Sequence, residues 1–253
     1  MSSVINDRVG EVSYTKYGTP AKIIDYISYS KVLIEFQDNY KYRYYTSYKN
    51  FKNGSVRNPY DRSVYNIAMF GDGYYDSKHI SYDVWNKMID RCYNSCFKTK
   101  RNYPYLNVTV CDEWLNFQNF ANWYDEYFYT VDDHIMMVDK DILTHNNNIY
   151  SPDKCLIVPQ CINEMFVKSN CIRGDMPIGV DYHKRDNKYR ARCHNQLLNK
   201  SVEIGQYKTK EEAFYAYKEY KENYIKQVAD YYKDKIPQKL YDALYNYEVL
   251  ITD

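Results

Sequence analysis

Between residues 111 and 166 the sequence contains an ordered series of short elements that limits the possible folds. After Cys111, apolar residues recur at helical spacing. Strand-like segments lie at Val138–Asp141 and at the start of Tyr150–Phe166. An Asn-rich loop separates the two strands, and a helix closes the series. This order places carboxylate and amide side chains at strand ends and on a helix, and such oxygen donors are typical ligands of a divalent metal ion. We therefore expect two strands and a helix around one site.

The composition limits where the chain works. No run of about 18 apolar residues occurs, which excludes a membrane-spanning helix, and Met1–Gly10 lacks the apolar core of a signal peptide. The seven cysteines have irregular spacing, as expected of reduced thiols in a cytoplasm. The 33 tyrosines carry apolar area with a polar tip, which suits wet interfaces and base stacking. We expect a cytoplasmic protein.

Charge divides the chain into blocks, although the net charge is only +1. Residues 1–68 hold 10 Lys and Arg against 6 Asp and Glu, residues 69–166 hold 8 against 14, and residues 173–210 hold 9 against 4. A basic, an acidic and a basic block in series indicate modules with separate roles. We predict three domains, residues 1–68, 69–170 and 171–253.

The first block has the alternation of β-strands. Lys22–Tyr26, Lys31–Phe36 and Lys41–Tyr45 alternate apolar and polar residues, with turn residues between them. We expect a small antiparallel β-barrel or meander. Tyrosines alternate with Lys41 and Arg43, a pattern that suits either a clamp for a single strand or an ordinary barrel rim; both interpretations stay open.

The middle block contains two predicted helices before the strands. One spans about Ser81–Tyr93, and the other spans about Glu113–Phe128 with Asp112 as its cap. Ile135–Ile142 and Cys155–Val158 are predicted strands. Pro159 suits the first turn of the closing helix.

The last block predicts three short strands and a long helix. The strands are Ile178–Lys184, Lys188–His194 and Ser201–Tyr207, and Thr209 with Glu212 forms a capping-box pattern at the start of the helix. After Pro237, a final short helix is expected. In the second strand one set of side chains faces the helix and the other faces solvent. The outward set and its neighbours supply the candidate DNA contacts, namely His183, Lys184, Arg185, Lys188, Arg190, Arg192 and His194.

The middle block resembles the HNH homing-endonuclease-like proteins of phages and mobile elements. Five separated pieces occur in that family's order, namely Trp85–Cys92, Val110–Trp114, Val138–Asp141, Tyr150–Pro152 and Asn163. The resemblance implies a ββα fold that holds one divalent metal, Mg²⁺ if the site is active. It places Asp139 and Asn163 on the metal-ligand positions, Lys140 on the histidine base and Lys154 on the asparagine that orients the base.

The base position is therefore lost. A lysine beside phosphate stays protonated, because the opposite charge favours its charged form, so Lys140 is a poor base. His134 and His145 lie nearby in the sequence and are the candidate substitutes. The excess of acidic residues in this block also disfavours binding of DNA by a nuclease core, because carboxylates repel phosphates.

The last block resembles the plant ethylene-response-factor type of DNA-binding domain, a three-stranded sheet on a helix. Gly179–Val180, Lys188–Arg192, Ile204–Tyr207 and Thr209–Tyr217 carry this resemblance. It implies DNA as the partner, with Arg190 and Arg192 offering guanidinium forks to guanine edges or phosphates.

The whole sequence predicts an α+β protein of several modules: a small β-barrel, an HNH-like ββα module with preceding helices, and a sheet-plus-helix domain. Its predicted function is DNA binding, in a phage or mobile-element protein whose HNH-like scaffold has lost its base. Two alternatives stay open. One is an active metal-dependent DNA nickase, and the other is a phage inhibitor that occupies a host nucleic-acid-binding enzyme. The sequence leaves the oligomeric state open.

Overall fold

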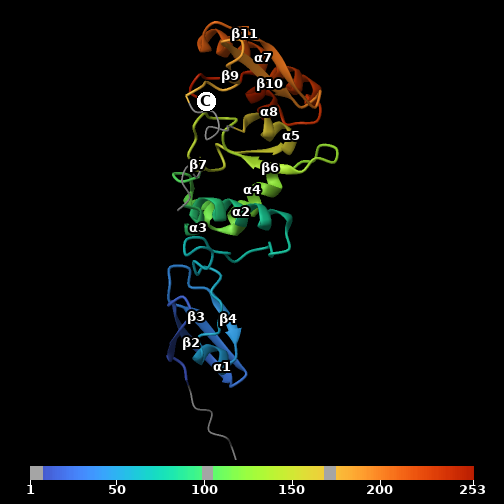
Figure 1. Cartoon of the computed structure of the whole chain (residues 1–253). Coiled ribbons are helices and arrows are strands. Elements are labelled where there is room, and N and C mark those ends of the chain that lie inside the picture. The colour runs from blue at the N-terminus through green and yellow to red at the C-terminus, as the bar shows by residue number, and fades with distance from the viewer. Residues whose placement is uncertain (1–7, 99–104, 168–174) are drawn as a thin grey trace, which may run out of the picture. The chain divides into compact units, whose positions relative to one another are not determined.

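The computed structural model describes residues 8–98, 105–167 and 175–253 (Figure 1). It is a mixed α+β structure, as predicted. The chain divides into two compact units, one of residues 1–100 and 110–123 and the other of residues 101–109 and 124–253. Among the described residues, no helix is long and apolar enough to cross a membrane.

Short strands and helices alternate along the described chain. The strands are β1 (Val12–Tyr14), β2 (Pro20–Ser28), β3 (Lys31–Phe36), β4 (Arg43–Thr46), β5 (Thr109–Val110), β6 (Met136–Asp139), β7 (Ile149–Tyr150), β8 (Leu156–Pro159), β9 (Val180–His183), β10 (Lys188–Asn195) and β11 (Lys200–Tyr207). The α-helices are α1 (Tyr48–Lys52), α2 (Ile80–Tyr93), α3 (Ser95–Lys98), α4 (Phe117–Tyr127), α5 (Gln160–Asn163), α7 (Lys210–Tyr232) and α8 (Gln238–Tyr245). The 3-10 helices are η1 (Asp112–Leu115) and η2 (Glu164–Phe166).

The N-terminal strands form an open meander. Their order is β1-β2-β3-β4, and each strand pairs antiparallel with the next. The predicted β-barrel is therefore wrong, since β1 and β4 both remain edges, whereas the meander is confirmed. Ile23, Ile34 and Phe36 are fully buried on one face of this sheet, where Phe51 of α1 packs against them.

The helix predicted over Glu113–Phe128 is broken in two. Met69 lies beside Asn116 in an isolated parallel bridge, with its N–H donating to Leu115 O and its carbonyl accepting from Phe117 N–H. Backbone groups used in this bridge cannot continue a helix, so η1 ends before Asn116 and α4 begins at Phe117. Cys111, not Asp112, occupies the cap position of η1, so the predicted cap is wrong.

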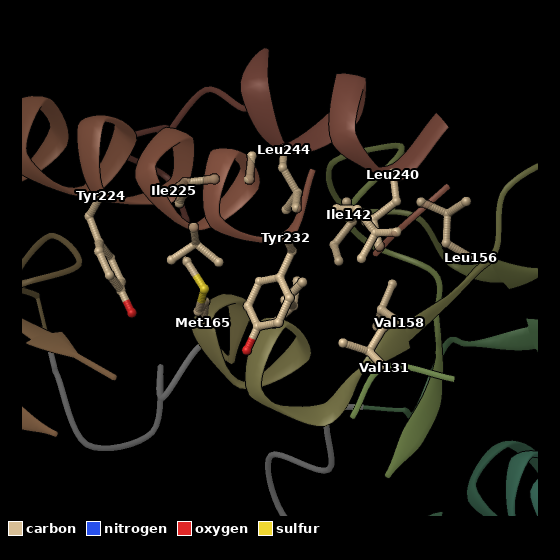
Figure 2. Packing of buried hydrophobic residues seen from close by; sticks show 14 residues of the cluster. Val131, Ile142, Leu156, Val158, Met165, Tyr224, Ile225, Tyr232, Leu240 and Leu244 are labelled. Carbon is tan, nitrogen blue, oxygen red and sulfur yellow. The ribbon is translucent and has the colours of Figure 1, made fainter. Parts of the chain in front are cut away.

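One apolar core of the second unit joins the strands at 136–159 to the C-terminal helices (Figure 2). β6 and β8 pair antiparallel, with Val138 opposite Ile157. Helices α7 and α8 supply the other side of the core. The buried members of this cluster are Val131, Ile142, Leu156, Val158, Ile162, Met165, Tyr224, Ile225, Val228, Ala229, Tyr232, Ile236, Leu240 and Leu244.

The C-terminal sheet has the predicted three strands and helix. Its order is β11-β10-β9, antiparallel throughout, and α7 packs against one face. Ala191 and Cys193 are buried there with Ala213 and Tyr217 of the helix. Alternation in β10 therefore directs Ala191 and Cys193 toward α7, and it turns Arg192 and His194 toward solvent.

The two clusters of the second unit meet along α7. Tyr220 and Tyr247 pack against both the 136–159 core and the C-terminal sheet's cluster. Residues on either side of position 170 thus share a core, while the domain limits at 68 and 170 stay predictions.

Candidate nucleic-acid interface

The open face of the C-terminal sheet carries a pair of arginines held by one carboxylate. Arg190 lies opposite Asp181 in β9 and Gln206 in β11. Its Nε donates to Asp181 Oδ1 over 3.0 Å, and its Nη2 donates to Oδ2 over 3.1 Å. Arg192 Nη2 also donates to Asp181 Oδ2. The two guanidinium groups are therefore fixed side by side.

Acidic side chains offset the charge at the centre of this face. Arg190 Nη1 lies 3.6 Å from Glu203 Oε2, an ion-pair distance. Glu203 is the register partner of Arg192, beside a bulge between Ala191 and Arg192. The two arginines, Asp181 and Glu203 thus carry no net charge between them.

Asp181 stays ionised in this setting. Partial burial opposes its ionisation, but the guanidinium groups of Arg190 and Arg192 outweigh that effect and lower the pKa of the carboxyl. The arginines consequently face a full negative charge, and their hydrogen bonds are of the strong, charge-assisted kind.

A group of exposed basic side chains lies at the margin of the sheet. Lys184, Arg185 and Lys188 are exposed in and beside the β9–β10 turn. His183 Nδ1 lies 2.9 Å from Asp186 Oδ2, and His194 is exposed on β10. The structure therefore gathers all seven predicted DNA contacts on one hairpin, with a neutral centre and a basic turn.

Sequence reasoning missed Asp181 and Glu203. The position of Asp181 could have been predicted from the hairpin register, because the turn after His183 sets Asp181 opposite Arg190. Glu203 was harder to find, since the bulge shifts the register between Ala191 and Arg192.

The predicted metal-ligand acid is engaged by its own loop. Asp139 is only 9% exposed, and its Oδ1 accepts the N–H groups of Asp141 and Ile142 over 2.8 and 2.7 Å. Burial raises the pKa of Asp139 to about 6, against the opposing effect of these two amides. Because the carboxylate caps the chain here, β6 ends at Asp139 instead of at the predicted Ile142.

Lys140 holds the same loop closed. Its Nζ donates to Asp141 Oδ1 over 2.7 Å and to Asn147 O over 2.8 Å. Asn147 Nδ2 in turn donates to Lys140 O and Ile149 O, both over 2.8 Å. These contacts join Lys140 to both ends of the loop, so its side chain has a structural role in this geometry.

The other predicted residues have separate partners. His134 Nε2 lies 3.1 Å from the hydroxyl of Tyr232, and His145 Nδ1 lies 3.6 Å from Asp253 Oδ1. Asn163 is the last residue of α5. Lys154 lies in the turn before β8, where its N–H donates to Ser151 O. Among the described residues, no hydrogen bond or ion pair joins Asn163 or either histidine to Asp139.

These residues do not fit a magnesium cage. One oxygen of Asp139 already accepts two backbone amides. Within the described ranges no group of three or more His, Cys, Asp or Glu side chains is arranged to hold a metal ion, and Mg²⁺ requires several oxygen ligands in octahedral geometry. The Mg²⁺ expectation stays a prediction that depends on the sequence resemblance.

The N-terminal tyrosines pack largely on their own chain. The ring of Tyr40 stacks on Tyr60 with centroids 3.8 Å apart, and Tyr42 lies parallel to Phe36 at 6.2 Å. Tyr45 is exposed, with Lys31 Nζ 4.9 Å from its ring centre. This arrangement leaves less ring surface for bases than the alternation suggests.

Comparison with known proteins finds a family match in the C-terminal sheet and helix. Residues 177–227, which comprise β9, β10, β11 and most of α7, match the AP2 domain family. The match leaves out the HNH-like stretch. No curated protein and no solved structure matches the chain. The sheet and helix that carry the arginine pair are thus similar to an AP2 domain, which supports DNA binding.

Proposed function

We propose that this protein binds duplex DNA through the open face of its β9–β10–β11 sheet. The observation that carries the proposal is the pair Arg190 and Arg192, fixed side by side on the exposed face of the matched AP2 domain. Planar guanidinium groups suit the paired acceptors of guanine in the major groove. A two- or three-stranded β-surface is narrow enough to approach that groove.

The geometry suggests a division of roles on this face. The arginines at the neutral centre contact base edges. Lys184, Arg185 and Lys188, exposed at the turn, contact phosphates, which supply most of the affinity and all of its salt dependence. In this arrangement α7 supports the sheet from behind and does not enter the groove.

The test is duplex binding by fluorescence anisotropy across a range of salt concentrations. Replacing Lys184, Arg185 and Lys188 by alanine should lower the slope of log K against log salt by about one for each phosphate that is no longer neutralised. Lys239→Ala is the matched control, because Lys239 is an exposed lysine of α8. A triple variant that keeps the wild-type slope would contradict the proposed turn contacts, and absence of salt-dependent binding by the wild type would contradict the function.

Neither alternative function gains support from the geometry. Nicking at Asp139 needs a carboxylate free to take a metal, and no surface of the described residues singles out a host protein. A supercoiled plasmid incubated with Mg²⁺ or Mn²⁺ tests the nickase directly. Nicking by the wild type that disappears in Asp139→Ala would restore that alternative.

A further inference from the structure

Asp181 is placed to control what the two arginines can bind. Its carboxylate takes Nε and Nη2 of Arg190 and also Nη2 of Arg192. Arg190 Nη1 remains beyond hydrogen-bond distance from Glu203, at 3.6 Å. Among the described residues no hydrogen bond occupies Nε or Nη1 of Arg192. Each guanidinium therefore keeps donors available while the rest of its fork is fixed.

Fixing the guanidinium groups of Arg190 and Arg192 changes which ligands they favour. A free arginine adopts many rotamers, and ordering it on binding costs conformational entropy. An arginine that is already oriented favours ligands that match its fixed donors, such as a guanine edge. A phosphate that approached the same groups would also approach the Asp181 carboxylate, and like charges repel.

We propose that Asp181 is a positioning residue that sets the DNA sequence preference of the sheet. It holds Arg190 and Arg192 toward base edges, and it disfavours their use as general phosphate contacts. This inference rests on the proposed function, since it concerns the same face. The general affinity then comes from the basic turn, and the discrimination comes from the neutral centre.

The experiment compares full-length variants on two DNA probes. A random duplex library is enriched with the wild-type protein, and the enriched duplex is paired with a scrambled duplex of equal composition. The quantity measured is the ratio of Kd for the scrambled duplex to Kd for the enriched one. Asp181→Asn should lower this ratio at least about tenfold, the size of one bidentate base contact, while its affinity for the scrambled duplex stays equal or rises.

Asp186→Asn is the matched control. It makes the same change of charge on the same hairpin, but Asp186 pairs with His183 and holds neither arginine. Its ratio should stay within about twofold of the wild type. Loss of folding would weaken binding to both probes together, so a fall in the ratio with preserved scrambled affinity reports on positioning.

Repeating the Asp181→Asn substitution in a protein that lacks both arginines makes the test independent of the stability of one variant. With Arg190→Lys and Arg192→Lys in place, the forks are absent, and adding Asp181→Asn should change the ratio by less than about twofold. An Asp181→Asn ratio equal to that of the wild type would overturn the inference. So would a wild type that binds DNA with no sequence preference, and that result would leave the proposed DNA binding intact. A wild type that binds no duplex would overturn both.

Discussion

At the scale of single residues, the buried carboxylate of Asp139 is tied to its own backbone. Asp139 accepts two amide hydrogens at the end of β6, and burial raises the pKa of its carboxyl to about 6. The folded pKa therefore exceeds the unfolded reference value of 3.8. The contribution of this group to stability is complete at low pH and is lost as pH rises through about 6.

Asp139→Asn should remove that pH dependence. The amide oxygen can still accept both backbone hydrogens, but it never ionises. We expect the unfolding free energy of the variant, relative to wild type, to increase by about 1 to 3 kcal/mol between pH 4 and pH 7. Urea denaturation at each pH measures the difference. Asp133→Asn, at an exposed position of the same segment, is the control. A difference for Asp139→Asn that stays constant with pH would contradict the proposed ionisation.

The outward arginines of β10 follow from period-two alternation, and the structure places them where the sequence predicts. Their carboxylate partner does not follow from alternation alone, because it depends on the pairing register. The HNH positions show the opposite case. Asp139 matches a motif position by sequence order and Lys140 replaces the histidine that follows it, yet the contacts of both residues close a loop. No local pattern distinguishes a loop cap from a metal ligand.

At the scale of elements, local signals succeed where a segment's own chemistry decides its structure. The capping box predicts the start of α7, and Thr209 and Glu212 form both of its hydrogen bonds. The break at Asn116 depends on Met69, which is distant in sequence, so helical spacing could not reveal it. The β-barrel prediction fails for a similar reason, since closure depends on pairing between the first and last strands.

Close packing of the C-terminal sheet on α7 depends on Gly179. Its φ of +75° is in the left-handed region, and a Cβ atom there would overlap the ring of Tyr217. Gly179→Ala should therefore destabilise the fold by about 2 to 5 kcal/mol, the sum of backbone strain and overpacking. Gly18→Ala is the matched control, because Gly18 has a φ of +85° and open space around it. Urea denaturation should give it only about 1 to 2 kcal/mol; equal losses would contradict the packing argument.

At the scale of the whole molecule, the second unit is organised along α7. The first half of this helix packs in the cluster of the C-terminal sheet, and the second half packs in the 136–159 core. Sequence composition indicates a boundary near residue 170, because charge changes there. Charge reports on the surface, however, and the shared core is apolar.

A fragment of residues 175–253 tests that boundary. It would lack the apolar partners of Tyr224, Ile225 and Leu240, which include Val158 and Ile162. We expect amide hydrogen exchange in the second half of α7 to be much faster in the fragment than in the full chain, because protection reflects local burial. The first half, which keeps its sheet, is the internal control. Equal protection in both proteins would show that residues 175–253 fold as an autonomous domain.

The continuity of α7 also restricts how this protein can change its length. Tyr217 and Tyr224 are seven residues apart, about two turns, so the same side of the helix serves both clusters. Inserting one residue between them would rotate the second half by about 100° and turn its apolar side away from the 136–159 core. Seven inserted residues would restore the rotation but shift the ends apart by about 10 Å. Both the length of α7 and the relative rotation of its two halves are therefore constrained. Length variation in related chains should be confined to the loops on either side of the helix.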